Sequence, residues 1–359
     1  MSKIRHLGTE LDAGQKQIDE NLSNLEDRLS EVYKEAADKV QSSLDEYLAS
    51  YKARDEEMRQ RVEAGLIDES EYIQWRENTI LRTRQMEAQV ASLTQDMVNA
   101  DAIAIQMIND ELPVVYASSY NFGIYRASTQ MDMCGIYSNA SFSLYNADAL
   151  KIIETKNPDL IPWDKNKMDK AKDKAWNRKH IQNALTQGIL QGDTIPQLSK
   201  RLLPLVNMDE NASRRTARTS YTSIQNQARR DATQAVRDEG IQMDEPWMSV
   251  LQENTRDTHL LLHGTLPDKN GLYGVGIIRT PLKYPADPDG DPEEVYNCQC
   301  RVQSFIHGID HSKDDELYAQ MMSEQHYEDW LSVQHYREDE TREALERRER
   351  LQNERKEGK

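Results

Sequence analysis

The chain has 359 residues, of which 37% are hydrophobic and 30% are charged, and it carries a formal net charge of −17. So polar a composition lets only part of the chain line a large core, and the absence of any apolar run of roughly 18 residues excludes a membrane span. The first residues, MSKIRHLGTELDAGQKQ, lack the apolar run of a secretion signal, and three cysteines are too few for a disulfide framework, so we expect synthesis in the cytosol.

Residues 1–111 predict a long helical arm. Apolar side chains recur mostly every three or four positions from Ile4 to Tyr47, which places them in one narrow stripe along a helix. No proline occurs before Pro113, so nothing in this stretch forces a helix to break. The stripe fits two interpretations, an intramolecular helical hairpin and a self-associating coiled coil, and the sequence leaves both open.

A turn is expected at Gly65, in the stretch RVEAGLIDESEYIQW. Glycine is favoured just after the end of a helix, and Asp68 or Ser70 is a suitable cap for the start of the next one. The sequence therefore predicts two long antiparallel helices, at about residues 15–64 and 69–110.

Residues 112–162 differ from the arm in composition. The part up to residue 150 is rich in Tyr, Ser and Asn and has few charges. We expect this segment to connect its neighbours, either as a short hairpin or as a segment that docks on the helices.

Residues 163–309 predict a compact α+β domain. Ile195–Pro196 opens a helix in which the proline stands in the first turn, where its missing N–H does no harm. Residues 208–211 fit the cap of a further helix that Gly240 ends. After Pro246, short apolar runs alternate with turns rich in Gly and Pro, which is typical of a small loop-rich module.

Residues 310–359 predict a charged tail. Its first part fits one amphipathic helix that docks through Leu317, Met321, Tyr327 and Leu331. The last residues are almost all charged, so we expect a solvated helix or a disordered end there. The predicted fold class is therefore α+β and predominantly α-helical.

Charge is distributed unevenly along the chain. Residues 1–110 hold 13 basic and 23 acidic side chains, a net of −10, and the tail from Asp310 holds 9 and 15, a net of −6. Residues 164–240 hold 15 basic and 9 acidic side chains, a net of +6. A basic middle between acidic ends suggests one surface for a polyanion or an acidic partner.

Five arginines of the helix expected before Gly240 form the candidate partner-binding face: Arg214, Arg215, Arg218, Arg229 and Arg230. Arginine binds phosphates and carboxylates through two parallel hydrogen bonds, so double-stranded DNA or an acidic protein would suit this face. Two structural alternatives stay open. The arginines can be the outer face of a packed helix, paired with Asp231, Asp238 and Glu239, or Arg218 can pair internally with acidic side chains of the C-terminal module.

Four short motifs occur in a characteristic order: GILQGDTIPQLSKRL, RRTARTSYTSIQNQARRDA, PWMSVLQENTRDTHLLLHGT and PADPDGDPEEVYNCQCRV. Together they resemble the head morphogenesis domain of tailed bacteriophages, the family of phage Mu protein F, over roughly residues 175–305. The positions that match the family pattern are Arg218, Thr219, Asn226, Trp247, Arg256, His259, Gly264, Asn297, Cys298, Cys300 and Arg301. The chain departs from that pattern at Gln252 and His263, where the family usually has acidic residues, which puts a chemical role of those carboxylates in doubt.

The pair Cys298 and Cys300, together with His259 and His263, supplies four ligands of the softness that tetrahedral Zn²⁺ prefers. Two histidines four residues apart can share a helix face, and zinc would stabilise a small domain that lacks a large apolar core. The alternative is that the cysteines alternate across a strand as small hydrophobic residues, while the histidines cap helices or pair with carboxylates.

No catalytic residues are predicted. His259 beside Cys298 lacks an oxyanion loop and a third orienting residue in the sequence pattern, and the phosphate-binding and zinc deaminase motifs are absent. The acidic run from Asp287 to Glu294 resembles a calcium loop, but prolines interrupt it and no suitably spaced Glu completes it, so a surface turn is expected.

The family resemblance implies a minor capsid or head morphogenesis protein of a tailed phage. Such a protein acts in procapsid assembly, associates with the portal protein and other capsid or scaffolding proteins, and can contact packaged DNA. The implied location is the virion, in the capsid interior or at the portal vertex, after synthesis in the host cytoplasm, with no membrane partner and no enzymatic activity. The alternatives are a toxin-like enzyme of the ADP-ribosyltransferase or nuclease type and a self-associating coiled-coil scaffold.

Overall fold

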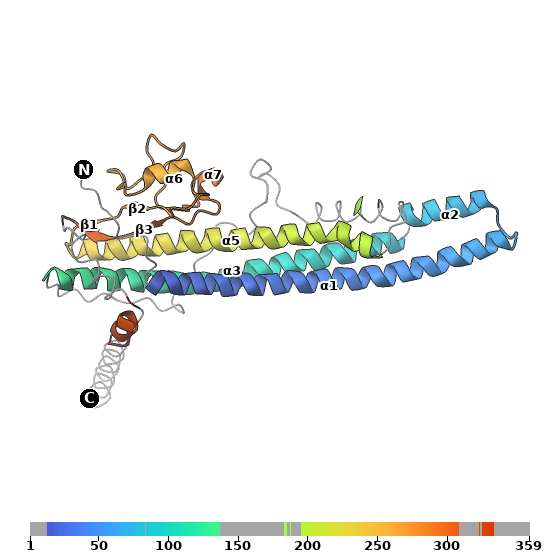
Figure 1. The fold of residues 1–359 in the computed structure, drawn as a ribbon, viewed down its shortest axis with the longest axis horizontal. Helices are drawn as coiled ribbons and strands as arrows, with labels where there is room; N and C mark the ends of the chain where they lie inside the picture. Colours follow the sequence, from blue (N-terminus) through green and yellow to red (C-terminus); the bar gives the residue numbers. More distant parts are fainter. Residues whose placement is uncertain are drawn as a thin grey trace, which may run out of the picture. The chain divides into compact units, whose positions relative to one another are not determined.

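The computed structural model describes residues 13–82, 84–136, 183–184, 187, 195–308, 323 and 325–333. In these ranges the protein is predominantly helical with four short strands, which confirms the predicted α+β fold class (Figure 1). None of the helices within them combines the length and the apolar character that crossing a membrane requires.

The chain divides into two compact units. The arm unit comprises residues 22–111 and the described part of 154–218, and the module unit comprises the described parts of 1–21, 112–153 and 219–359. Helices α1 (Ala13–Glu63), α3 (Arg84–Met133) and α5 (Ile195–Asp238) each contribute residues to both.

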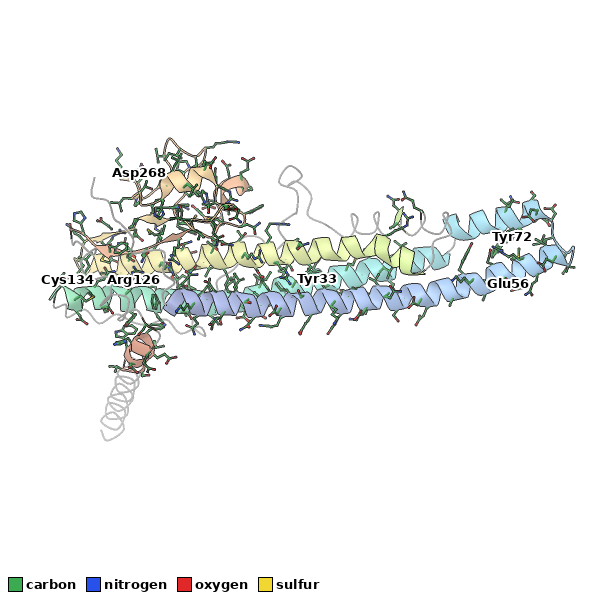
Figure 2. All side chains as sticks on the ribbon, viewed as in Figure 1. Tyr33, Glu56, Tyr72, Arg126, Cys134 and Asp268 are labelled. Atoms are coloured by element: carbon green, nitrogen blue, oxygen red, sulfur yellow. The ribbon has the colours of Figure 1, made fainter. Side chains whose placement is uncertain are left out.

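The turn predicted at Gly65 is confirmed. Gly65 has a φ of +68°, the left-handed conformation that glycine adopts without steric cost, just after the end of α1. Asp68 caps α2 (Glu69–Arg82): its Oδ1 accepts the Glu71 N–H at 2.8 Å, and Glu71 Oε2 accepts the Asp68 N–H at 3.0 Å. Tyr72 of α2 then donates to Asp55 of α1 at 2.8 Å, as expected of antiparallel neighbours (Figure 2).

The apolar stripe of α1 is buried in the arm unit. The buried positions on this helix include Leu25, Leu29, Tyr33, Ala36 and Val40. Tyr33 donates to Asp101 of α3 at 2.8 Å, and Ser30 donates to Glu210 of α5 at 2.6 Å, so α1 contacts both of these helices. An intramolecular contact of the stripe is therefore present.

Helix α3 is longer than the predicted helix, which was expected to end near residue 110. It continues through Pro113 to Met133, so the hairpin considered for residues after 112 is wrong for 112–133. A proline inside a helix costs about 3 kcal/mol. Almost every residue from Val115 to Met131 is buried, and this packing offsets that cost. The rest of the connecting segment, 137–162, lies outside the described residues.

Helix α5 begins at Ile195 and is followed by Gly240 with a φ of +86°, as predicted. The helix break expected at residues 208–211 is wrong, because α5 is continuous across them. The Glu210 carboxylate contacts Ser30 and Arg214 instead of capping a new helix. Of residues 163–194, at the start of the predicted α+β domain, only 183–184 and 187 are among the described residues.

Two small antiparallel sheets organise residues 241–308. Strand β1 (Met243–Asp244) pairs with β4 (Phe305–Ile306), with Met243 opposite Ile306. Strand β2 (Trp247–Met248) pairs with β3 (Arg301–Val302), with Trp247 opposite Val302. Helices α6 (Asp257–Leu262) and α7 (Pro292–Val295) complete the loop-rich module that the sequence predicts.

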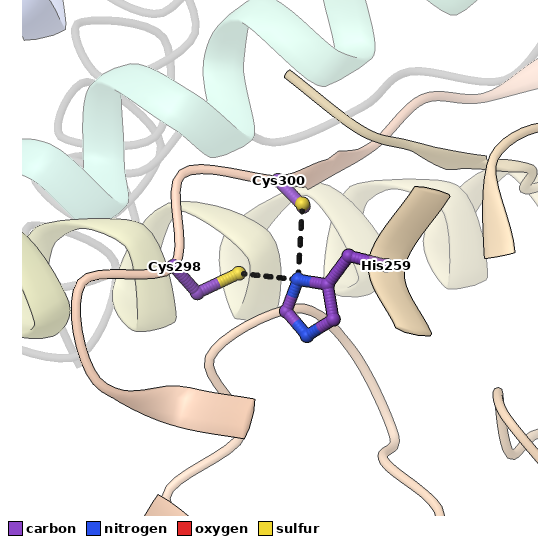
Figure 3. Close-up of side chains that lie close together, drawn as sticks. All are labelled: His259, Cys298 and Cys300. Atoms are coloured by element: carbon purple, nitrogen blue, oxygen red, sulfur yellow. Dashed lines mark hydrogen bonds between the residues drawn. The ribbon is translucent and has the colours of Figure 1, made fainter. Parts of the chain in front are cut away.

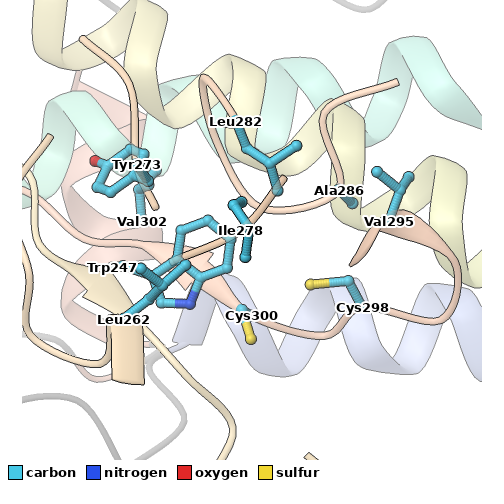
Figure 4. Packing of buried hydrophobic residues seen from close by; sticks show 10 residues of the cluster. All are labelled: Trp247, Leu262, Tyr273, Ile278, Leu282, Ala286, Val295, Cys298, Cys300 and Val302. Carbon is cyan, nitrogen blue, oxygen red and sulfur yellow. The ribbon is translucent and has the colours of Figure 1, made fainter. Parts of the chain in front are cut away.

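The core of this module gathers around Trp247, whose side chain is fully buried (Figure 4). The buried residues that surround it are Leu262, Tyr273, Ile278, Leu282, Ala286, Val295, Cys298, Cys300 and Val302. Gly274, at a φ of +78°, lets the chain pass so close that an added Cβ would lie 2.5 Å from Ile278 Cγ1. The core is thus small, and its loops fold closely over it.

The helical residues 325–333 dock in the module unit. Tyr327 is buried against Phe122 and Tyr125 of α3, at ring-centroid distances of 5.0 and 5.2 Å. Trp330 and Leu331 pack on the same cluster. This confirms the predicted docking for Tyr327 and Leu331, whereas Leu317, Met321 and the charged end lie outside the described residues.

Candidate metal centre

His259, Cys298 and Cys300 form one buried group in the module (Figure 3). His259 lies on α6, and the two cysteines lie in the turn that leads from α7 into β3. Each of the three residues is at most 3% exposed. Helix α6 and the strand entry at β3 therefore bring together residues that are about 40 positions apart in the chain.

A single buried side chain of α5 holds the cysteine turn in place. Asn226, 0% exposed, donates from Nδ2 to the Cys300 carbonyl at 3.0 Å and to the Pro285 carbonyl at 3.1 Å. Its Oδ1 accepts the Val302 N–H at 2.8 Å. The amide thus hydrogen-bonds the backbone on both sides of Arg301, the first residue of β3. These bonds fix the position of the Cys300 backbone and therefore the point from which its side chain extends.

The distances among the three ligand atoms suit a tetrahedral ion. His259 Nδ1 lies 3.3 Å from Cys300 Sγ and 3.7 Å from Cys298 Sγ, and all three atoms lie within 4.8 Å of one another. Zinc bonds of about 2.3 Å to sulfur and about 2.05 Å to nitrogen give, at a tetrahedral angle, an edge of about 3.6 Å between sulfur and nitrogen. The two observed N···S distances bracket that edge, so the group fits Zn²⁺ with little rearrangement.

The two thiols differ in acidity. A hydrogen bond from Cys298, together with the nearby His259, lowers the pKa of Cys300 below its ordinary value. Burial and the neighbouring Cys300 raise the pKa of Cys298 well above it. The pair therefore favours a thiolate at Cys300 and a thiol at Cys298. The thiolate is the form that binds metals. Cys300 is therefore already in the binding form, whereas Cys298 must release a proton when a metal binds.

The far side of the imidazole faces a carboxylate. Glu294 Oε2, on α7, lies 3.0 Å from His259 Nε2, and Thr258 Oγ1 donates to the same oxygen at 2.9 Å. The ring edge of His259 also packs on Trp247, with a centroid distance of 5.2 Å. The imidazole thus has the Glu294 carboxylate beside Nε2, the two sulfurs beside Nδ1 and the Trp247 ring packed against it.

The predicted ligand His263 does not join this group. Helix α6 ends at Leu262 and Gly264 takes a φ of +74°, so the four-residue spacing from His259 no longer means a shared helix face. His263 Nδ1 accepts the Ser249 N–H at 3.1 Å instead. Among the described residues, no further His, Cys, Asp or Glu completes the group.

Glu294 is the residue that the sequence interpretation missed. It belongs to the acidic run expected to be a surface turn, and no spacing rule relates it to a histidine 35 positions earlier in the chain. Its neighbour Glu293 is exposed, as that expectation required, whereas Glu294 is half-buried. The only signal in the sequence was the excess of carboxylates close to Cys298.

The remaining family positions hold the module together. Thr219 Oγ1 accepts the Asn297 N–H at 3.1 Å, and Arg256 donates to the Tyr296 carbonyl. The Gly264 N–H donates to the Trp247 carbonyl at 2.7 Å. Arg301 lies half-buried in β3. Thr219 and Arg256 therefore hold the backbone just before the cysteines, and Gly264 bonds the backbone of Trp247.

The predicted partner-binding arginines Arg214, Arg218, Arg229 and Arg230 contact other parts of the chain. Arg214 and Arg218 both bind Glu26 of α1, at 3.5 and 2.9 Å, so Arg218 pairs internally, although with the arm and not with the C-terminal module. Arg229 is buried and donates to Gln15 at 3.0 Å. Arg230 donates to the carbonyls of Gly271 and Lys283. Arg215 is half-buried.

Cysteine, histidine and glutamate in this order also resemble a nucleophile, its base and an orienting residue. Glu294 is the third residue that the sequence pattern lacked. However, Cys298 is 1% exposed and Cys300 is 3% exposed, which leaves no room for a substrate at either sulfur. Holding a small ion is the chemistry that this arrangement suits.

Residues 179–303 match the family model of phage Mu protein F like proteins. The match confirms the resemblance predicted from the sequence motifs, and its range includes His259, Cys298, Cys300 and Asn226. No curated protein and no solved structure shows a significant similarity to the chain.

Proposed function

Because residues 179–303 match the family model of phage Mu protein F like proteins, we propose that the chain is a minor capsid protein that acts in procapsid assembly. Its place would be the virion, in the capsid interior or at the portal vertex. The single observation that carries this proposal is the family match, which spans the module from α5 to β3. The role would be structural: binding and templating without turnover.

The portal and other capsid or scaffolding proteins are the proposed partners. The arm unit supports this because its helices bury one face and leave many charged side chains exposed, among them Lys34, Glu35, Asp38 and Lys39 of α1. Such a solvated charged surface keeps the folded chain in solution until it binds its partners during assembly. Most described members of the α1 stripe are buried within the chain, so self-association through them would require the helices to rearrange.

Binding to purified portal rings tests the partner proposal. The full chain is mixed with rings of the portal protein from the same head gene cluster, and the mixture is separated by size with light scattering detection. The proposal predicts that the chain elutes with the rings at a defined copy number. A chain that elutes alone at every concentration, or that forms only oligomers of itself, contradicts it, and the second result supports a coiled-coil scaffold.

Contact with packaged DNA is part of the same proposal. It is supported by the net charge of +6 in residues 164–240, although Arg214, Arg218, Arg229 and Arg230 contact other parts of the chain. Binding through phosphates releases counterions, so the affinity of the full chain for double-stranded DNA should fall linearly with salt on logarithmic axes. If the full chain does not bind double-stranded DNA even at low salt, the proposed DNA contact is wrong.

We also propose that the ion suited to His259, Cys298 and Cys300 is Zn²⁺, which would stabilise the small module. Protein purified without chelators should contain about one zinc ion per chain, and Cys298→Ser should lose it. Cys134→Ser is the matched control, because Cys134 lies on α3's C-terminal turn, outside the group. Metal-free wild-type protein of equal thermal stability would disprove the zinc site.

A further inference from the structure

The carboxylate of Glu294 stands in a line of contacts that ends at the two sulfurs. Thr258 Oγ1 donates to Glu294 Oε2 at 2.9 Å, and the same oxygen lies 3.0 Å from His259 Nε2. On the other side of the ring, His259 Nδ1 faces Cys300 and Cys298. The contacts therefore run from Thr258 to Glu294, from Glu294 to His259, and from His259 to the two cysteines.

The geometry separates the roles of the two imidazole nitrogens. A neutral imidazole carries one N–H and one lone pair, and only the nitrogen with the lone pair can bind a metal. A carboxylate accepts hydrogen bonds and cannot donate them, so Glu294 favours the form that has the proton on Nε2. That form leaves the lone pair on Nδ1, the nitrogen that faces the sulfurs.

Burial strengthens this preference. His259 is 1% exposed, so water does not compete for Nε2, and the Glu294 side chain is 15% exposed. The electrostatic attraction between an imidazole N–H and an ionised carboxylate 3.0 Å away is stronger in such surroundings than in water. Glu294 also cannot replace His259 as the ligand from its position, because the ring lies between its oxygen and the sulfurs.

We infer that Glu294 is the positioning residue of the metal centre, which holds the proton of His259 on Nε2 and so presents Nδ1 to the ion. This inference rests on the proposed zinc site for its effect on metal affinity, but its effect on the imidazole does not require the metal. Thr258 supports the same oxygen from the preceding position in the chain. Helix α7 thereby becomes part of the site, although it contributes no ligand.

Metal affinity is the first test. Full-length wild type, Glu294→Gln, Glu294→Ala and Glu293→Gln are titrated with zinc in competition with a chromophoric chelator. Loss of such an outer carboxylate typically weakens metal binding about 10–100-fold. We expect the larger loss for Glu294→Ala, a smaller one for Glu294→Gln, which keeps an acceptor oxygen, and none for the exposed neighbour Glu293→Gln. Equal affinities in wild type and Glu294→Ala overturn the inference.

The protonation of the ring is the second test, and it distinguishes a failure of this inference from a failure of the zinc site. Long-range proton–nitrogen NMR spectra of the full chain show which nitrogen of His259 carries the proton. The inference predicts a proton on Nε2 in wild type, with or without zinc, and a mixture of both forms in metal-free Glu294→Ala. A proton on Nδ1 in wild type overturns the inference whether or not the protein binds zinc, whereas a proton on Nε2 in a protein that binds no zinc leaves Glu294's role standing and removes only the zinc site.

Discussion

Asn226 connects three separate backbone segments from one fully buried side chain. It bonds the carbonyls of Pro285 and Cys300 and the N–H of Val302, and its own Nδ2 also reaches the Thr222 carbonyl on α5. Because these backbone groups are buried, they lose their hydrogen-bond partner inside the protein if the amide is removed. The module's attachment to α5 therefore depends strongly on this one residue.

We predict that Asn226→Ala lowers the free energy of unfolding of the module by about 3 kcal/mol, because leaving a buried polar group without a partner costs about 1–3 kcal/mol and several are affected. This change in the free energy of unfolding is measured by denaturant unfolding monitored by tryptophan fluorescence, since Trp247 lies in the module core. Gln227→Ala, at an exposed neighbouring position, is the control and should change stability by less than about 0.5 kcal/mol. A similarly small effect of Asn226→Ala would contradict the account.

At the same scale, the sequence allowed two cysteines and one histidine of the candidate site to be predicted, because C-x-C spacing and residue softness are local properties. It did not allow the exclusion of His263, since that depends on α6 ending at Leu262. Nor did it allow Glu294 to be found, because its approach to His259 depends on how α7 packs beside α6. Long-range contacts of this kind have no signature in a single sequence.

At the scale of elements, the sequence predicted where helices begin and end, because those signals are local. It did not predict where a helix continues through an expected break. The Gly65 turn, the Asp68 cap, the start at Ile195 and the end before Gly240 all rest on residues within one turn of the boundary. The continuity of α3 through Pro113 goes with the burial of the residues that follow the proline, and α5 continues through residues 208–211, where Glu210 contacts Ser30 of α1. Packing energy overrides local preference there, and it is invisible until the partners are known.

The contact between α1 and α5 in the arm unit gives a prediction about those helices. Glu26 receives both Arg214 and Arg218, and its side chain is only 13% exposed. We expect Arg218→Glu to destabilise the chain through repulsion of Glu26, and the double exchange Arg218→Glu with Glu26→Arg to recover part of the loss. Since the Arg218 side chain is 41% exposed, the coupling in a double-mutant cycle should be modest, about 0.5–1 kcal/mol.

Thermal unfolding of the four proteins in that cycle measures the coupling. Arg279→Glu, at a side chain that is 91% exposed, is the control for the general effect of charge reversal. Strictly additive effects of Arg218→Glu and Glu26→Arg would show that the pair does not fasten the helices.

The docked helix 325–333 gives a second prediction at this scale. Tyr327→Ala removes the ring that contacts Phe122 and Tyr125, and truncating a buried aromatic costs about 3 kcal/mol or more. We expect hydrogen exchange of residues 325–333 to accelerate at least tenfold, while α1 stays protected. Val333→Ala, at a side chain that is 49% exposed, should leave exchange unchanged, and unchanged exchange in Tyr327→Ala would show that the cluster does not hold the helix.

At the scale of the whole molecule, the chain combines a module that matches the family model of phage Mu protein F like proteins with long helices that the match does not cover. The module is small, and its core would gain stability from an ion held by His259, Cys298 and Cys300. The arm unit is a set of packed helices with a charged exterior. This division suits a protein whose module is fixed in structure and whose helices offer surface to partners in a growing head.

The protein content of purified phage heads tests the central claim most directly. Procapsids and finished heads are isolated from cells that express the complete head gene cluster, and their chains are quantified by mass spectrometry, beside a matched preparation in which this gene is deleted. The account predicts that the chain is present in a few copies per particle and that its deletion reduces the yield of correctly assembled heads. Particles that lack the chain at every stage and assemble normally without it would contradict the account.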